Sequence, residues 1–167
     1  MTVDIRPTNR PAKPVRESRV TLTQLMGPQD ANILGNVHGG LIMKLCDEAG
    51  AMAAMKHARC PTVTVAIDSM SFHSPVNIGD LITVSAEVTW VGRTSLETRV
   101  LVNAENVATG EITHTNTAYF VYVALNEAGQ PVVVPTLICE TPEEKARLDR
   151  AARRQEFRLE QRRQGLL

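Results

Sequence analysis

The stretch from Gly39 to His57, GGLIMKLCDEAGAMAAMKH, decides the fold of this chain. Apolar residues occur on almost every side of it, and it contains no proline and little β-branching. These properties predict a helix of about five turns over residues 39–57. A helix that is apolar nearly all round has to be covered by other elements, so we expect it to be wrapped by the rest of the fold.

The segments around this helix alternate between apolar and polar residues, which is the pattern of β-strands. Strand candidates lie at residues 18–25, 62–72, 82–90, 96–102, 112–123 and 132–134. Their short connections favour antiparallel pairing, and the order of elements does not suit a doubly wound nucleotide-binding fold. The sequence therefore predicts an α+β fold in which a curved antiparallel sheet of five to six strands wraps the long helix. Such a sheet has open edges, and edge-to-edge dimerisation would cover one of them.

Two charged segments flank this predicted domain of residues 17–139. Residues 1–16 contain three prolines and few large apolar groups, so we expect a flexible N-terminal arm. Residues 140–167 start with a capping box, in which Thr141 is the N-cap and Glu144 follows three residues later, and this predicts a C-terminal helix. The helix has few apolar residues, so we expect it to lie on the domain or on a partner subunit.

The overall charge is balanced, with 18 Lys plus Arg and 18 Asp plus Glu among 167 residues. That balance argues against a nucleic-acid-binding protein, which is normally basic. It conceals an acidic central domain between two basic ends. No apolar run is long enough to span a membrane, and the first residues lack the apolar stretch of a signal peptide. Together with three scattered cysteines, these features predict a cytoplasmic protein without a disulfide framework or a metal site.

Residues near the start of the long helix are candidates for catalysis. Gly39 and Gly40 offer backbone N–H groups at the positive end of the helix, where they can bind a carbonyl oxygen. Asp47 lies roughly 10 Å further along the helix axis, so a carbonyl group and a carboxylate would meet the needs of acyl transfer to water. Each signal also has an ordinary explanation. The glycines can serve only the loop, Asp47 can belong to a solvated stripe with Lys44, and Asn32 can be a turn former.

The run DANILGNVHGGLIMKLCDEAGA at residues 30–51 resembles the signature of hotdog-fold acyl-CoA thioesterases of the cytosolic acyl-CoA hydrolase group. The resemblance extends over roughly residues 17–155. It implies that Asp47 is the catalytic carboxylate, that Asn32 is its partner from the opposite subunit of a dimer, and that acyl-CoA is hydrolysed to a carboxylic acid and CoA. It also implies a homohexamer built as a trimer of dimers, with no cofactor, nucleic acid or membrane partner.

The resemblance leaves the role of Asp47 open between a general base for water and a nucleophile that forms a mixed anhydride. In either route, the N–H of Gly39 or Gly40 would bind the carbonyl oxygen. Two rival functions also stay open. A hotdog dehydratase would need a catalytic histidine, for which His38 is the candidate. A non-catalytic acyl-CoA sensor would normally carry an effector domain, for which residues 1–16 are too short.

CoA is a polyanion, so basic and polar residues must contact it. The turn with Arg93, Thr94 and Ser95 resembles the nucleotide-contact region of the family. Lys56 is a further candidate, although a basic residue near a helix C-terminus also complements the helix dipole. Ser74 belongs to a segment that either lines the pantetheine route or simply ends a strand. We expect arginines of the C-terminal tail, supplied by a neighbouring subunit, to meet further ligand charge.

Overall fold

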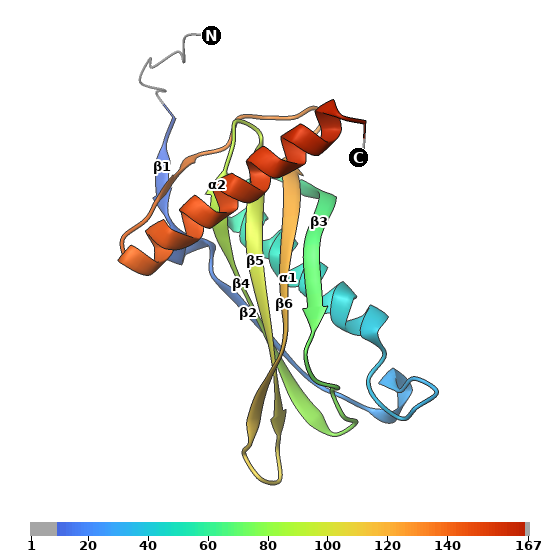
Figure 1. Ribbon diagram of the computed structural model, residues 1–167. Helices are drawn as coiled ribbons and strands as arrows, with labels where there is room; N and C mark the ends of the chain where they lie inside the picture. The colour runs from blue at the N-terminus through green and yellow to red at the C-terminus, as the bar shows by residue number, and fades with distance from the viewer. Residues whose placement is uncertain (1–9, 166–167) are drawn as a thin grey trace.

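A curved antiparallel sheet curls around one long helix, and a second helix crosses the opposite face of the sheet (Figure 1). The computed structural model describes residues 10–165. The sheet has the order β2-β4-β5-β6-β3, and its strands are β2 (Val20–Leu25), β3 (Thr62–Phe72), β4 (Asp80–Val91), β5 (Ser95–Asn106) and β6 (Ile112–Ala124). The helices are α1 (Gly39–Ala58) and α2 (Pro142–Arg163). This arrangement confirms the predicted α+β fold, with its wrapped central helix, five-stranded sheet and C-terminal helix.

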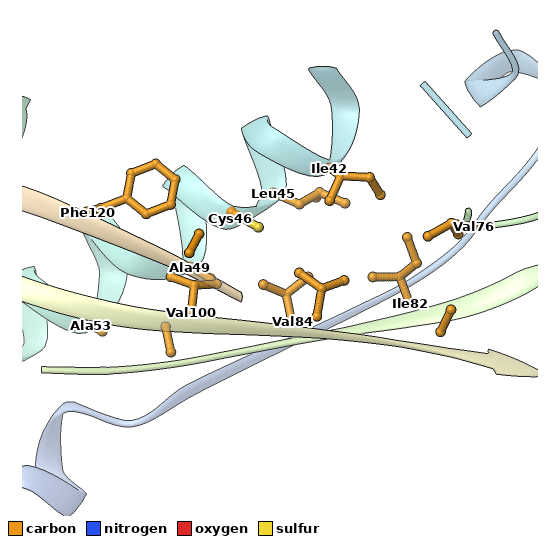
Figure 2. Packing of buried hydrophobic residues seen from close by; sticks show 14 of the residues in the cluster. Ile42, Leu45, Cys46, Ala49, Ala53, Val76, Ile82, Val84, Val100 and Phe120 are labelled. Atoms are coloured by element: carbon orange, nitrogen blue, oxygen red, sulfur yellow. The ribbon is translucent and has the colours of Figure 1, made fainter. Parts of the chain in front are cut away.

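The core lies between α1 and the inner face of the sheet, as Figure 2 shows. Ile42 and Leu45 of α1 pack in one cluster with Val84 and Val100 of the sheet. Further along the helix, small residues such as Ala49 are fully buried, which lets the helix backbone approach the strands closely. Each large aliphatic side chain buried here contributes roughly 1.5–3 kcal/mol to stability. No helix in the described part of the chain is both long and apolar enough to cross a membrane.

The segment before β2 is attached to the domain. Strand β1 (Ala12–Pro14) pairs in parallel with β7 (Thr136–Ile138), and the 3-10 helix η1 (Val15–Ser18) follows it. The expectation of a flexible arm over residues 1–16 is therefore wrong for its described part, because backbone pairing with a distant strand holds that part in place. Residues 1–9 lie outside the described part of the chain.

The last strand does not lie where the apolar pattern places it. A strand is predicted over residues 132–134, but that segment is irregular and the final strand is β7. Val134 is buried and its N–H donates to the carbonyl oxygen of Arg93 at 2.9 Å, so burial explains its apolar character without a strand. Pro135 follows directly and has no N–H to extend a ladder from this segment.

Helix α2 lies on the outer face of the sheet, the first of the two places expected for it. The predicted capping box is confirmed, since Thr141 Oγ1 accepts the N–H of Glu144 at 3.2 Å and the Glu144 carboxylate accepts in return. Arg154 donates twice to the buried carboxylate of Glu97, at 3.2 and 2.6 Å. Its guanidinium also lies 3.8 Å from the centre of the Tyr119 ring. These contacts join α2 to β5 and β6.

Strand β3 forms one edge of the sheet and has only β6 as a partner within the described chain. Its side chains Val63, Val65 and Ile67 are exposed by 44%, 44% and 45%. An edge of this kind leaves backbone N–H and C=O groups unpaired and apolar groups in water. Strand β3 is therefore the edge that best suits the expected edge-to-edge dimerisation.

Candidate active site

Asn32 lies in the loop that leads into α1, and backbone N–H groups fix its side chain. Its Oδ1 accepts hydrogen bonds from the N–H groups of Leu34 at 2.8 Å and Asn36 at 3.3 Å. Gly35, with a φ of 83°, adopts a left-handed conformation between them that favours glycine. The Nδ2 group of Asn32 has no partner among the described residues. Asn32 is thus a turn former through one atom and an available donor through the other.

The first turn of α1 contains one open backbone donor. His38 is the N-cap, and its Nδ1 accepts the N–H of Gly40 at 3.0 Å. The N–H of Gly39 has no partner among the described residues, so Gly39 is the better placed of the two predicted oxyanion donors. The cap also keeps one ring nitrogen of His38 engaged in a structural bond. Nε2 of His38 takes no part in this bond, so the contact alone does not distinguish the thioesterase from the dehydratase.

A cavity of about 330 Å³ brings together three of the predicted site residues. Asn32 lines it from the loop, Gly39 from the start of α1 and Ser74 from the segment after β3. Phe72, the last residue of β3, completes one wall. Asp47 does not line this cavity, so within one chain the oxyanion donors and the carboxylate occupy different places.

Hydroxyl groups, rather than basic residues, contact the Asp47 carboxylate. Thr64 of β3 donates to Oδ1 at 2.6 Å, and the hydroxyl of Tyr122 lies 3.2 Å from the same oxygen. Lys44, the expected neighbour in a solvated stripe, pairs instead with Glu48 at 3.5 Å. Hydroxyl donors stabilise a carboxylate without cancelling its charge. Asp47 is therefore contacted by neutral donors and has no described cationic partner, which suits a base or a nucleophile.

Thr64 and Tyr122 are absent from the site residues that the sequence predicts. Thr64 lies in a strand where threonine is common, and its contact with Asp47 depends on how β3 packs beside α1. Tyr122 carries a weak signal in the sequence, because a tyrosine inside an apolar strand needs a partner for its hydroxyl. That signal shows that a partner is needed but does not identify it.

Cys46 is the nearest potential nucleophile to Asp47 in the sequence, but it is buried. Burial, with the charge of Asp47 beside it, raises the pKa of the Cys46 thiol to about 12. The reactive form of cysteine is the thiolate, which this environment disfavours. Cys46 is therefore a packing residue.

The turn predicted to contact CoA lies at the other end of β3 from this first cavity. Arg93 and Thr94 connect β4 to β5, and their carbonyl oxygens accept backbone N–H groups from neighbouring segments. Ser95 lines a second cavity of about 160 Å³, which it shares with Val65 of β3 and Arg162 of α2. A tail arginine of the same chain therefore joins the predicted nucleotide-contact region.

Other basic residues have partners elsewhere in the chain. The ammonium of Lys56 donates to the carbonyl oxygen of Arg19 at 2.6 Å, which ties α1 to the segment before β2. Arg154 and Arg158 of the tail pair with Glu97 on the outer face of the sheet. These three positive charges serve the fold, so they do not support the expected roles in binding CoA.

The predicted residues thus form two groups near opposite ends of β3. Asp47 contacts Thr64 close to the start of the strand, and the cavity of Ser95 lies at the same end. The cavity of Asn32 is bounded by Phe72, the last residue of the strand. One chain therefore presents a carboxylate at one end of β3 and carbonyl-binding donors at the other.

Comparison with known proteins connects this geometry to a family. Residues 34–111 match the model of the Thioesterase superfamily. A solved hexameric acyl-CoA thioesterase is 40% identical in sequence and superimposes with a TM-score of 0.87, covering 90% of this chain and 97% of that one. The chain belongs to the acyl-CoA thioesterase family. The hotdog fold implied by the resemblance is confirmed.

Another thioesterase relative, the cytosolic acyl coenzyme A thioester hydrolase of Rattus norvegicus, is 37% identical over 153 residues. The aligned part covers 90% of this chain but 40% of the rat protein. The chain therefore spans less than half the length of that relative.

The acyl-CoA hydrolase of Staphylococcus aureus has been solved with butyryl coenzyme A and coenzyme A. It is 33% identical, has a TM-score of 0.85, and the match covers 93% of this chain and 94% of that one. Solved variants of that enzyme replace an asparagine, an aspartate and a threonine by alanine. The three replaced positions have the same spacing along the chain as Asn32, Asp47 and Thr64 have here.

Proposed function

We propose that this chain hydrolyses acyl-CoA thioesters to a carboxylic acid and CoA, with Asp47 as the catalytic carboxylate. The observation that carries the proposal is the setting of Asp47, where Thr64 and Tyr122 contact Oδ1 and no described basic residue pairs with it. Membership of the thioesterase family supports the reaction type. The complex of the Staphylococcus aureus hydrolase with butyryl coenzyme A supports the substrate class.

We further propose that two copies of the chain share each site by pairing antiparallel through β3. A two-fold axis at this edge would set the start of one β3 against the end of the other. Asp47 of one copy would then approach Asn32 and Gly39 of the partner subunit. The pairing would also cover the exposed side chains Val63 and Val65. The hexameric relative supports higher assembly, and three such dimers would make a hexamer.

The proposed reaction begins when the N–H of Gly39 and the amide of Asn32 bind the carbonyl oxygen of the thioester. Asp47 from the other subunit takes a proton from a water molecule, and the water oxygen attacks the carbonyl carbon. The C–S bond then breaks, CoA leaves as a thiolate, and the proton on Asp47 passes to the thiolate or to solvent. Oxyanion donors are typically worth about 10²–10³ in rate and a positioned base about 10²–10⁴, so both are needed.

Direct attack by Asp47 is the alternative route, and labelled water distinguishes the two. In a single turnover in water enriched in heavy oxygen, base catalysis places the label in the released carboxylic acid. Nucleophilic attack forms a mixed anhydride between Asp47 and the acyl group. When water opens this anhydride at the Asp47 carbonyl carbon, the label enters Asp47 and an original oxygen of Asp47 leaves in the acid. Mass spectrometry of the product and of the peptide with Asp47 gives the answer.

For the CoA part of the substrate, we propose that Arg93 and Arg162 meet the phosphate groups beside Ser95. Guanidinium groups bind phosphate oxygens through paired hydrogen bonds, which supports arginines in this role. Ser74 of the partner subunit would lie along the pantetheine route. The reaction uses water and protein groups, so the absence of a metal or cofactor is part of the proposal. We also propose a cytoplasmic location, which similarity to the cytosolic acyl coenzyme A thioester hydrolase of Rattus norvegicus supports.

Thiol release from acyl-CoAs of increasing chain length tests the function. We expect hydrolysis by the unmodified protein and its loss in Asp47→Asn. The matched control is Glu48→Gln, which removes a neighbouring exposed carboxylate that pairs with Lys44. Binding of acyl-CoA without thiol release would indicate the non-catalytic sensor, and formation of enoyl thioesters would indicate the dehydratase.

A further inference from the structure

The hydroxyl of Tyr122 reaches from the sheet to the catalytic helix. The side chain is fully buried, and its hydroxyl lies 3.0 Å from the carbonyl oxygen of Asp47 and 3.2 Å from the carboxylate Oδ1 of the same residue. No other described tyrosine contacts α1, since Tyr119 lies on the outer face under Arg154. A single buried group thus contacts both the backbone and the side chain of the proposed catalytic residue.

Gly50 makes this contact possible. A Cβ atom at this position would lie 2.4 Å from the Tyr122 hydroxyl and 2.8 Å from the Oγ1 of Thr98. Glycine inside a helix costs about 0.5–1 kcal/mol relative to alanine. The helix therefore carries a weakening residue at the one point where the hydroxyl of Tyr122 enters between α1 and the sheet.

Burial raises the pKa of Tyr122, and the charge of Asp47 raises it further. The raised pKa favours the protonated hydroxyl, which is the form that donates a hydrogen bond. Its one proton faces two acceptors, the carbonyl oxygen and the carboxylate. An ionised Asp47 carboxylate is the stronger acceptor for the Tyr122 hydroxyl proton. When the carboxylate is protonated, the Tyr122 hydroxyl donates to the Asp47 carbonyl oxygen instead.

We propose that Tyr122 is a positioning residue that holds the Asp47 carboxylate in its ionised, reactive orientation. Thr64 and Tyr122 both bond Oδ1, and no described residue bonds Oδ2, so Oδ2 is the oxygen that faces the attacking water. When Asp47 takes up the proton of that water, the Tyr122 hydroxyl turns to the Asp47 carbonyl oxygen and keeps a partner. The inference rests on the proposed function, because it gives Tyr122 a role only in the chemistry of Asp47.

The test is Tyr122→Phe, which keeps the ring and removes the hydroxyl, with Tyr119→Phe as the matched control. In Tyr122→Phe we expect kcat to fall about tenfold and KM to change by less than about twofold, because a hydrogen bond to a charged group is lost but substrate contacts are not. The pH dependence of kcat should also change, because the variant removes a hydrogen-bond donor from the carboxylate that accepts the proton of water. Gly50→Ala displaces the same hydroxyl from the helix side and should give the same pattern. Tyr119→Phe should leave kcat and its pH profile unchanged.

Two results would overturn the inference while the proposed function stands. In the first, Tyr122→Phe keeps the kcat and the pH profile of the unmodified protein, while Asp47→Asn is inactive. In the second, Tyr122→Phe loses activity equally at every pH together with a lower Tm, which is the behaviour of a purely structural residue. Failure of the proposed function itself looks different, because then the unmodified protein releases no thiol or Asp47→Asn remains active.

Discussion

Two carboxylates on opposite faces of the sheet have contrasting partners. On the inner face, Asp47 is half-buried and contacted by the hydroxyls of Thr64 and Tyr122. On the outer face, Glu97 is fully buried and receives a two-point contact from Arg154 and a further one from Arg158. Both carboxylates accept hydrogen bonds, but only that of Glu97 pairs with positively charged side chains of the described chain.

The contrast teaches how the same side-chain chemistry serves structure or reaction. A carboxylate paired with guanidinium groups has its charge compensated and its geometry fixed, so it joins α2 to the sheet. A carboxylate that is hydrogen-bonded only by neutral hydroxyl donors has no compensating positive charge. Its second oxygen has no described partner, so it can accept a proton. We therefore expect changes at Asp47 to affect rate and changes at Glu97 to affect stability.

The largest expected effect is on activity at Asp47. Asp47→Asn removes the proton acceptor and keeps the shape, so kcat should fall by about 10²–10⁴. Its Tm should stay within a few degrees of the unmodified value, because no described ion pair is broken. Thiol release and thermal unfolding on the same preparation check both parts. A large loss of Tm would contradict the claim that Asp47, unlike Glu97, affects rate and not stability.

The second effect is on stability at Glu97. Glu97→Ala removes the partner that Arg154 and Arg158 share, while Arg158 keeps its ion pair with Asp68. The cost should therefore be at most about 3–5 kcal/mol, the value for a fully broken buried pair. Urea unfolding measures this loss. Glu105→Ala, on the same strand without a described ion pair, is the control and should cost far less. Rates per folded molecule should stay near normal in both variants, unlike those of Asp47→Asn.

A third prediction concerns His57, a buried residue outside the candidate active site whose described hydrogen-bond partner is an uncharged backbone carbonyl group. Its Nε2 lies 3.1 Å from the carbonyl oxygen of Pro135, and Nδ1 is buried without a partner. Burial lowers the pKa of His57 below the ordinary 6.5, so the folded state favours the neutral ring. As the pH falls through about 6.5, the unfolded chain binds a proton that the folded chain does not, and stability declines by at most about 1.4 kcal/mol per pH unit.

Urea unfolding between about pH 7.5 and about pH 5.5 measures that decline. The same series in His57→Gln should show a shallower slope, because the titrating group is gone. Equal slopes in the two proteins would show that other groups govern the acid sensitivity.

The smallest expected effect concerns the positive charges near the start of β3, beside Ser95. Arg93→Ala and Arg162→Ala should each raise KM for acyl-CoA a few-fold with kcat unchanged, and added salt should shrink the difference. Arg147→Ala is the control, because that arginine pairs with Glu87 on the outer face at 3.1 Å. If neither substitution changes KM, the proposal that Arg93 and Arg162 contact the phosphate groups of CoA is wrong.

Local sequence patterns predicted the elements that depend on local contacts. The capping box of Thr141 and Glu144 and the extent of α1 follow from neighbouring residues, and both are confirmed. The pairing of β1 with β7 joins segments from the two ends of the chain, so no local pattern reveals it. For the same reason, the apolar segment 132–134 resembled a strand although its burial has another cause.

The site was predicted unevenly for a similar reason. Asp47, Asn32 and Gly39 lie within one short stretch, where a motif can identify them. Tyr122 reaches Asp47 only because β6 packs on α1, and that contact is set by the tertiary fold. The separation of Asp47 from the Asn32 cavity within one chain is also a property of the fold, and it is the observation on which we base the proposed shared site.

The central claim is that one working site draws Asp47 from one chain and Asn32 from another. Complementation tests it most directly: Asp47→Asn and Asn32→Ala chains are purified, confirmed to be nearly inactive alone, then unfolded together and refolded as a mixture. The account predicts that the mixture regains about a quarter of the unmodified activity, because half of the random dimers contain one intact site. A mixture as inactive as its two components would contradict the account, since it would place both residues in the site of a single chain.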